Sequence, residues 1–399
     1  MMEHKFEEKL QLLPAGEIDA RLGKVTAAMA QADIDSVLIS DNANLFYLTG
    51  RIFCGYIYVS RNGGLRYFLR RPSILTGDGV HRIRKPEDMG PLLADTVKAD
   101  TRVGFTVDDT PYSTVMRLRK AIGVTDIANG SAVMRAARSV KTPMEVKLIA
   151  ESGTRLSDIY RQVPRLYREG MTDIELQIEI ERVLRLHGCL GKFPVSGTEL
   201  EIFMGNVLTG DNADAPSPYD FAMGGAGLGP SLPVGANGTI IRPGKPVMVD
   251  MNANFDGYLA DSTRCYITGD CPDEARRAND LSRRICEAIA NAARPGVEAR
   301  AMYELAMNMV AEAGMADFFM GHRSHAGFVG HGIGITVNEL PVLAPRSRDV
   351  FAAGNVIAIE PKFVIPGIGA VGVENSYEIM AEGPARRLTD APEDIVSLD

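Results

Sequence analysis

The sequence lacks the features that mark several large classes of protein. Its first 135 residues contain neither a GxGxxG dinucleotide-binding motif nor a Walker phosphate-binding loop. Its five cysteines form no CxxC pair, which argues against a zinc knuckle or a disulfide framework and favours reduced thiols. It has no apolar run long enough to span a membrane, and the charged N-terminal stretch has no apolar signal core. We therefore expect a cytoplasmic protein with no membrane partner.

Basic residues are outnumbered by acidic residues and are scattered along the chain. There are 43 lysine and arginine residues against 51 aspartate and glutamate residues, which gives a net charge of −8. The arginine pairs Arg70-Arg71 and Arg283-Arg284 lie far apart in the sequence and are typical of solvated faces. This balance argues against nucleic acid or an anionic membrane as a partner.

The length and the order of patterned segments predict two domains. A chain of 399 residues exceeds the usual size of a single core. Residues 1–135 alternate between helical and strand patterns, and Arg61-Asn-Gly-Gly64 between two strand-like runs is a hairpin signal. We expect helices over 86–98 and 112–122, with a short strand between them. This pattern predicts an α/β domain with a mixed sheet, and we find no catalytic constellation within it.

Residues 136–399 begin with a pair of helix signals that recurs later. Thr142-Pro-Met-Glu145 combines an N-cap, a first-turn proline and a capping-box glutamate, and predicts a helix to about residue 168. Thr172-Asp-Ile-Glu175 repeats the capping box before a second helix. Helical patterns between 272 and 313 form another such pair. The repeat predicts two halves related by a pseudo-twofold axis, each with two helices and a sheet, so the expected fold class is α/β of the α+β type.

An aspartate pair lies on a predicted β-hairpin of the second domain. An apolar run carries Asp250 into a strand, Asp256-Gly257 is a hairpin-turn signal, and the returning run contains Asp261. The hairpin would point both carboxylates into one interior, where a carboxylate is costly unless it is paired or bound to a cation. The structural alternative is two turn aspartates that pair with solvent or with Arg264.

Three further residues end or interrupt apolar patterns downstream. His331 lies in the glycine-rich segment Gly-His-Gly-Ile-Gly, and Glu360 and Glu374 each end an apolar strand pattern. Each has a structural alternative, either a histidine in a glycine-bounded turn or a glutamate at a solvated strand end. With the aspartate pair they supply four carboxylates and one imidazole, which suits two hard or borderline divalent ions such as Mn, Co, Fe or Zn. Two such ions could share a hydroxide and polarise a carbonyl.

The order of these residues resembles the pita-bread metallopeptidases, the superfamily of methionine aminopeptidase, aminopeptidase P and prolidase. Residues 1–135 look like the creatinase/prolidase N-terminal domain, and residues 136–399 look like the pita-bread catalytic domain. The resemblance implies a hydrolase of Xaa-Pro peptides, a homodimer, and Glu360 as the general base. It also implies metal binding by all five residues, in chain order Asp250, Asp261, His331, Glu360 and Glu374.

Histidines that are usual in the family are missing from two positions. The first falls on Ser217 or nearby, within a glycine- and proline-rich segment over 204–238 that contains no histidine. We expect this segment to be a loop that lines the pocket. The second falls on Asn338, which can donate a hydrogen bond but cannot carry a proton. An arginine often found two residues before the last glutamate is Gly372 here.

Polar residues near these positions are candidates for the missing roles. The family's histidines position the substrate carbonyl and stabilise the tetrahedral intermediate. We expect Ser217 and Asn338 to take part in catalysis, and Asn338, Tyr219 and His325 to contact the substrate. His322 and His325 could also substitute for the missing histidines in space. The alternative is that both are surface-loop residues.

Three functions are compatible with this pattern. The first, which we expect, is an Xaa-Pro aminopeptidase or dipeptidase whose dinuclear metal centre activates water against the carbonyl of a small peptide. The second is a small-molecule enzyme on the same scaffold, a C–N hydrolase or a dimethylsulfoniopropionate-lyase-like enzyme, which the missing histidines favour. Creatinase-like chemistry dispenses with metal, however, whereas this chain keeps every ligand position. The third is a non-catalytic binding module, which the retained carboxylates argue against.

Overall fold

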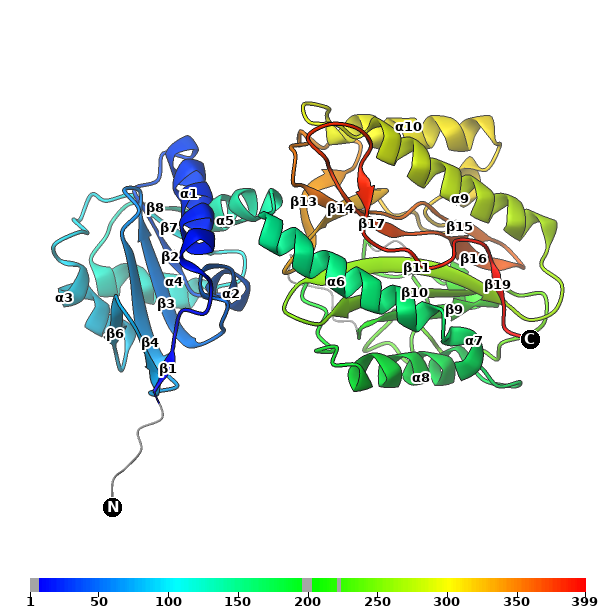
Figure 1. Ribbon diagram of the computed structural model, residues 1–399, viewed down its shortest axis with the longest axis horizontal. Helices are drawn as coiled ribbons and strands as arrows, with labels where there is room; N and C mark the ends of the chain where they lie inside the picture. The colour runs from blue at the N-terminus through cyan, green and yellow to red at the C-terminus, as the bar shows by residue number, and fades with distance from the viewer. Residues whose placement is uncertain (1–6, 196–202, 221–223) are drawn as a thin grey trace, which may run out of the picture. The chain divides into compact units, whose positions relative to one another are not determined.

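The chain forms two compact units, residues 1–138 and residues 139–399 (Figure 1). The structure is a computed structural model that describes residues 7–195, 203–220 and 224–399. No helix in these ranges is both long and apolar enough to cross a membrane.

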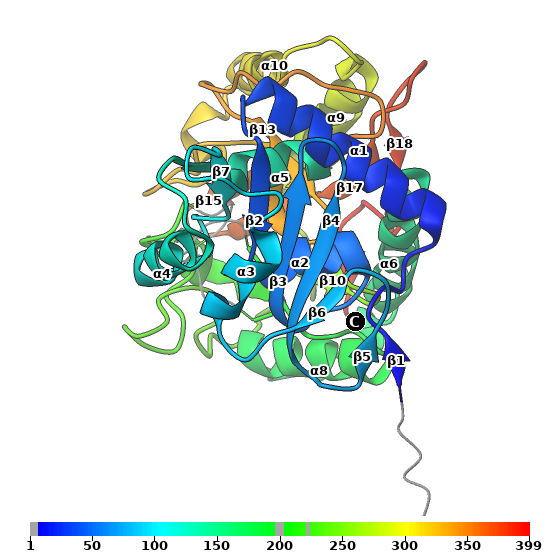
Figure 2. The same ribbon diagram turned by 90° about the vertical axis from the view of Figure 1, so that its left-hand side faces the viewer.

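The first unit is built on a six-stranded mixed sheet, as the alternating sequence pattern predicted (Figure 2). Its central hairpin turns at the predicted Asn62-Gly63 position, where Gly63 adopts a left-handed φ of 83°. The strands, in spatial order, are β6 (Val80–Arg82), β4 (Leu65–Arg71), β3 (Cys54–Ser60), β2 (Ser36–Ile39), β7 (Val103–Phe105) and β8 (Ile127–Asn129). A separate short parallel pair joins β1 (Glu8–Lys9) and β5 (Leu75–Thr76).

Helices accompany this sheet, and one of them is shorter than predicted. The helices are α1 (Ala15–Gln31), α2 (Asn42–Thr49), the 3₁₀ turn η1 (Pro86–Asp88), α3 (Met89–Leu93), α4 (Tyr112–Ile122) and α5 (Gly130–Ser139). The helix expected over 86–98 is wrong in extent, because its α-helical part ends at Leu93. Beyond it, the backbone N–H groups of Thr96 and Val97 both donate to the Leu93 carbonyl oxygen, which closes the segment in a turn.

The first half of the second unit places helices on a four-stranded sheet (Figure 1). Both predicted capping boxes are present, at Thr142 with Glu145 and at Thr172 with Glu175. The helices are α6 (Pro143–Tyr160), α7 (Val163–Leu166) and α8 (Asp173–Leu186). The strands, in spatial order, are β19 (Val396–Ser397), β11 (Leu259–Ile267), β10 (Val247–Asn254) and β9 (Gly205–Thr209).

Two expectations for this half are wrong. The helix predicted to reach residue 168 ends at Tyr160, four residues before Pro164. A proline ring clashes with the carbonyl four residues earlier, so the helix stops and the short α7 follows. The segment 204–238 is not a loop throughout, because Gly205–Thr209 forms β9 on the edge of β10 and the 3₁₀ turn η2 (Gly210–Asp214) follows it.

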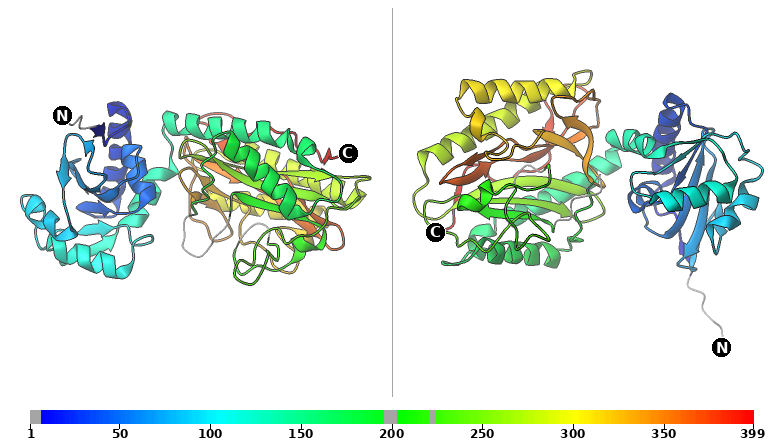
Figure 3. Two further views of the ribbon diagram at one scale, coloured as in Figure 1. Left: turned by 90° about the horizontal axis from the view of Figure 1, so that it is seen from below. Right: turned by 180° about the vertical axis from the view of Figure 1, so that it is seen from behind.

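The second half repeats the plan with two long helices over antiparallel strands (Figure 3). The helices are α9 (Asp273–Ala292), α10 (Ala299–Glu312) and the 3₁₀ turn η3 (Ala316–Phe318). The five-stranded sheet consists, in spatial order, of β13 (Val337–Leu343), β12 (Gly330–Ile333), β14 (Val356–Ile359), β17 (Asn375–Glu378) and β18 (Arg386–Arg387). A separate hairpin joins β15 (Lys362–Ile365) and β16 (Gly369–Gly372).

The β10–β11 hairpin separates two sets of side chains. Val247, Val249 and Met251 alternate onto one face and join the apolar core that α6 and α8 cover. Residues between them, including Asp250, point to the other face, toward the second half of the unit. An isolated bridge between Thr263 and Glu374 links β11 to the strands of that half. The interior between the two halves is therefore lined on one side by acidic strand residues.

Candidate metal centre

The β10–β11 hairpin brings the two predicted aspartates onto one face. Asp250 lies opposite Thr263 and Asn252 lies opposite Asp261 in the antiparallel register. Directly opposed residues share a face of a sheet, and so do residues two apart on one strand. Gly257, with a left-handed φ of 86°, completes the turn predicted from Asp256-Gly257. Asp250 and Asp261 therefore reach the same interior from neighbouring strands.

The second half supplies the other three residues at the ends of its own strands. His331 lies within β12, Glu360 directly follows β14, and Glu374 directly precedes β17. Thr263 of the hairpin donates a hydrogen bond from Oγ1 to Glu374 Oε2 at 2.7 Å, so the two halves meet at this point. We refer to Asp250, Asp261, His331, Glu360 and Glu374 as the acid–histidine cluster.

Burial excludes solvent as the partner of these carboxylates. The members of the cluster are between 1% and 6% exposed, so neither the glutamates nor the aspartates lie at solvated positions. Arg264 does not pair with the aspartates either. It is 1% exposed, and its guanidinium donates to the carbonyl oxygens of Ala391, Thr263 and Glu374. Arg264 thus fixes the backbone that carries Glu374.

Three members of the cluster lie close enough together that they could hold one cation. Asp261, His331 and Glu374 each offer one ligand atom, and these atoms all lie within 4.8 Å of one another. His331 Nδ1 lies 3.0 Å from the carbonyl oxygen of Gly332, a contact in which Nδ1–H donates and Nε2 is left facing the cluster. We refer to Asp261, His331 and Glu374 as the triad.

Lys362, which was not predicted from the sequence, lies among three carboxylates of the cluster. The Lys362 ammonium lies 2.8 Å from Asp250 Oδ2, 2.7 Å from Glu360 Oε2 and 3.2 Å from Glu374 Oε2. Its side chain is 1% exposed. The signal was present in the sequence, because residues two apart on an extended segment share a face and Lys362 follows Glu360 by two.

Burial and the Lys362 charge divide the carboxyl groups of the cluster into two kinds. Burial, reinforced by the charge of Asp250, raises the pKa of Asp261 to about 7. Burial also holds the pKa of Glu374 well above its usual range. For Glu360 the effect of burial is outweighed by the Lys362 ammonium and by His331, which lower the pKa to about 2. Burial therefore dominates at Asp261 and Glu374, both in the triad, whereas positive charge dominates at Glu360.

The imidazole of His331 is itself influenced by this arrangement. Its Nε2 lies 3.2 Å from Glu360 Oε1. Burial alone would lower the pKa of His331, but the hydrogen bond and charge of Glu360 outweigh it and raise the pKa. Phe328 packs its ring at 68° against the imidazole, with centroids 5.9 Å apart, which shields this side of the cluster.

A polar asparagine on the same sheet face has no partner of its own. Asn252 is 1% exposed, and neither atom of its side-chain amide has a hydrogen-bond partner among the described residues. It lies opposite Asp261, two residues from Asp250. A buried amide without partners is costly, so its presence beside the cluster is typical of a site that receives a ligand or water.

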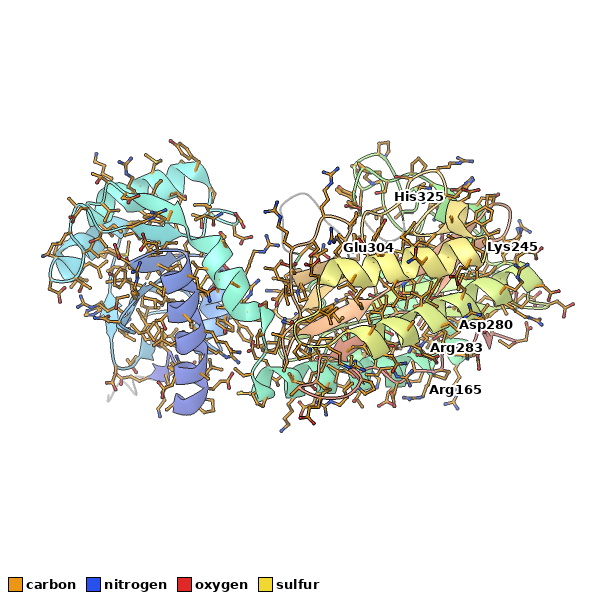
Figure 4. All side chains as sticks on the ribbon, turned by 90° about the horizontal axis from the view of Figure 1, so that it is seen from above. Arg165, Lys245, Asp280, Arg283, Glu304 and His325 are labelled. Carbon is orange, nitrogen blue, oxygen red and sulfur yellow. The ribbon has the colours of Figure 1, made fainter. Side chains whose placement is uncertain are left out.

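One predicted catalytic residue, Ser217, and two predicted substrate residues, Tyr219 and His325, meet in one small cavity. Ser217, Tyr219 and His325 line it together with His322. His325 is exposed on a loop (Figure 4), and its Nδ1 lies 2.8 Å from the Phe319 carbonyl oxygen. His322 is held by Asp214, whose Oδ2 lies 3.0 Å from His322 Nδ1. Segments about 100 residues apart in sequence therefore converge here, but no member of the acid–histidine cluster lines this cavity. That 204–238 lines the pocket of the metal site stays a prediction.

The fourth residue, Asn338, lies elsewhere. It is a half-buried residue of β13 with a left-handed φ of 62°, and it is not among the residues that line this cavity. Asparagine tolerates this backbone conformation better than most residues. The next residue, Glu339, is buried and accepts hydrogen bonds from the backbone N–H groups of Ile335 and Thr336, which fixes the turn before it. The structure thus does not bring Asn338 together with Ser217, Tyr219 and His325 around one cavity.

Comparison with known proteins defines the family. The family model described as metallopeptidase family M24 matches residues 147–381, more than half of the chain. The chain belongs to metallopeptidase family M24. A second family model, the creatinase/prolidase N-terminal domain, matches residues 21–140. The resemblance inferred from the sequence is confirmed, and the chain is a hydrolase of the metallopeptidase class.

M24 relatives match along almost the whole chain at low identity. An Xaa-Pro dipeptidase of Pyrococcus horikoshii is 23% identical over 386 residues, covering 95% of this chain and 99% of the relative. An Xaa-Pro dipeptidase of Lactobacillus helveticus is 26% identical over 379 residues, covering 91% and 95%.

Solved structures confirm the two-domain fold with its pita-bread catalytic unit. An Xaa-Pro dipeptidase from Bacillus anthracis superposes with a TM-score of 0.79 at 21% identity, covering 95% of this chain and 99% of that one. The N-terminal domain of FACT complex subunit SPT16 from chickpea superposes with a TM-score of 0.72 at 12% identity, covering 97% and 100%. These likenesses concern the fold alone, so what this M24 chain acts on has to be argued from its site.

Proposed function

We propose that the chain is a metal-dependent hydrolase that cleaves the peptide bond of Xaa-Pro dipeptides or of N-terminal Xaa-Pro sequences. The observation that carries this proposal is the buried triad of Asp261, His331 and Glu374 within an M24 fold. Relatives over almost the full length of the chain carry the name Xaa-Pro dipeptidase, which supports the substrate class.

The residues present fit a divalent cation. Two carboxylates and one imidazole, with no thiolate, favour hard or borderline ions such as Mn, Co, Fe or Zn. Asp261, His331 and Glu374 would hold the ion. Such an ion supplies Lewis acidity and lowers the pKa of a bound water. A dinuclear centre that also uses Asp250 and Glu360 stays a prediction. Both carboxylates are paired with the Lys362 ammonium.

Side chains of the protein supply the other catalytic and substrate-binding roles. We propose Glu360 as the general base, as the resemblance implies, because its Oε1 lies 3.2 Å from His331 Nε2, beside the triad. The Lys362 ammonium orients this carboxylate through Oε2 and leaves Oε1 toward the triad side. Ser217, Tyr219 and His325 are proposed to contact the substrate at the cavity that they line, and Asn338 is proposed to donate a hydrogen bond.

A small-molecule enzyme on the same scaffold is the second candidate. A C–N hydrolase or a dimethylsulfoniopropionate-lyase-like activity is favoured by two observations. The two family histidines fall on Ser217 or nearby and on Asn338, and neither a serine nor an asparagine side chain can take up a proton at neutral pH as an imidazole does. Lys362 adds a cation that the sequence pattern did not anticipate. Both changes alter how a carbonyl oxygen or a leaving group would be stabilised.

The test is hydrolysis of an Xaa-Pro dipeptide and an Xaa-Pro tripeptide after loading with Mn, Co, Zn or Fe. We expect release of the N-terminal residue, with proline as the second product of the dipeptide and a Pro-Yaa dipeptide as the second product of the tripeptide. This release should stop on chelation and be lost in Asp261→Asn, which keeps the shape of a triad ligand but not its charge. The ratio of the two rates separates a dipeptidase from an aminopeptidase. Protein that binds metal but cleaves the Xaa-Pro bond of neither peptide would refute the proposal, and small amides and lyase substrates would then be assayed. The homodimer implied by the resemblance stays a prediction for light scattering.

A further inference from the structure

Lys362 lies where a cation of the acid–histidine cluster is expected. Its ammonium donates to Asp250 Oδ2 and Glu360 Oε2 at 2.8 and 2.7 Å, which are distances of charged hydrogen bonds, and forms an ion pair with Glu374 Oε2 at 3.2 Å. Two of these carboxylates, Asp250 and Glu360, are the members of the cluster outside the triad. The ammonium therefore engages the carboxylates that a second metal ion would require.

The lysine is held in this position by its surroundings. The residue is fully buried. Its carbonyl oxygen accepts a hydrogen bond from the Met320 N–H at 2.8 Å, and the preceding carbonyl of Pro361 accepts one from Ser282 Oγ. The stem thus begins at a fixed backbone position and ends among three carboxylates.

Gly372 makes the room that the lysine stem needs. It lies directly opposite Lys362 in the β15–β16 hairpin. A Cβ atom at position 372 would lie 2.9 Å from both Cα and Cγ of Lys362, closer than side chains pack. The Lys362 side chain therefore fits only because residue 372 is a glycine.

Charge and space both oppose a second ion while the lysine is present. Four carboxylates would be over-neutralised by two divalent ions together with an ammonium. Asp250 Oδ2 and Glu360 Oε2 already accept from Lys362, so they would have to exchange that donor for a metal. The pocket as built does not fit two metal ions, whereas the triad fits one.

We propose that Lys362 permanently replaces one of the two cations expected in this cluster, so that the site binds a single divalent ion on Asp261, His331 and Glu374. The proposal rests on the proposed function only in requiring that the triad binds metal. It holds for either candidate substrate class, because it concerns the composition of the centre.

The experiment counts ions in the whole protein with three variants of one position. Wild type, Lys362→Arg and Lys362→Ala are loaded with Mn²⁺, desalted and measured by elemental analysis, and electron paramagnetic resonance reports whether the ions are coupled. We expect about one uncoupled ion per chain in wild type and in the charge-matched Lys362→Arg. Lys362→Ala, which removes the ammonium and clears its space, is expected to bind about two ions with a coupled signal.

Each outcome decides between the proposals. Two coupled ions in wild type would overturn the inference about Lys362, whether or not Xaa-Pro peptides are cleaved. One ion in wild type and still one in Lys362→Ala would also overturn it, because the lysine would then not be what excludes the second ion. One ion in wild type and two in Lys362→Ala, without cleavage of the Xaa-Pro bond in either peptide by the wild type, would support this inference and refute the proposed peptidase. Lys362→Ala is checked by circular dichroism, and if it does not fold, the wild-type spectrum alone decides.

Discussion

The buried ion pair between Lys141 and Glu339 offers a sharp test of how the second unit is held together. The side chains are 1% and 3% exposed, and Lys141 Nζ lies 3.0 Å from Glu339 Oε2. The pair ties the segment before α6 to β13, where Glu339 follows Asn338. We expect Lys141→Met, which keeps the apolar stem but removes the charge, to destabilise the unit.

The size of the effect follows from what remains around each partner. Removing one member of a buried ion pair costs about 3–5 kcal/mol. In Lys141→Met, Glu339 keeps hydrogen bonds from the backbone of Ile335 and Thr336 at 3.2 Å, so we expect the lower end, about 3 kcal/mol. In Glu339→Gln, the ammonium keeps a weaker acceptor, the Ser139 carbonyl at 3.4 Å, so the loss should be about 4–5 kcal/mol. For a unit of this size, about 3 kcal/mol lowers Tm by roughly 6–12 °C.

The measurement is a double-mutant cycle, in which differential scanning calorimetry compares the wild type, both single variants and the double variant. The double variant removes both charges, so it should lose about 2–3 kcal/mol less than the sum of the two single losses. Lys147→Ala, at an exposed lysine of α6, serves as the control and should change Tm very little. A Lys141→Met loss below about 1 kcal/mol, or strictly additive losses, would refute the reasoning.

Three further predictions follow from features described above. Asp261→Asn should weaken metal binding at least about 100-fold, since even indirect partners of metal ligands contribute 10–100-fold, and calorimetric titration would show it. Thr172→Ala should cost about 1 kcal/mol in urea denaturation because it removes an N-cap; an unchanged midpoint would contradict the capping role. Burial raises the pKa of Cys265 to about 12, above its unfolded value, so the reactive thiolate forms at lower pH once the chain unfolds. A thiol reagent at pH 8 should therefore label exposed Cys54 in the native protein and Cys265 only after denaturation.

Local signals predicted much of the fold because local chemistry decides those elements. The capping boxes at Thr142 and Thr172 and the Asp256-Gly257 turn each specify their element within a few residues. The helix toward residue 168 was overextended because Pro164 was given too little weight against a continuous helical pattern. β9 was missed because its pairing partner, not its own composition, makes it a strand. A Cβ on Gly205 would lie 2.0 Å from the Asp250 carbonyl, so close pairing with β10 needs the glycine that made the segment look like a loop.

The sequence predicted the five residues of the acid–histidine cluster but not the lysine that neutralises part of their charge. Each acidic residue of the cluster ends or occupies an apolar strand pattern, and that is visible in sequence. Lys362 also fits the pattern, but a single lysine in an apolar run has many ordinary explanations, and only the fold shows which carboxylates surround it. The separation of Asn338 from Ser217 and His325 likewise depends on tertiary structure, because the cavity joins loops from both halves of the second unit.

The position of Lys362 also bears on how long the protein lasts when metal is scarce. In a pocket of carboxylates alone, the metal-free chain carries uncompensated buried charge, and its folded population rises and falls with the supply of the ion. Lys362 is a counter-ion that is covalently part of the chain and cannot dissociate. The metal-free protein should therefore persist as a folded reserve, and the number of folded molecules should depend less on metal supply than in a pocket of carboxylates alone.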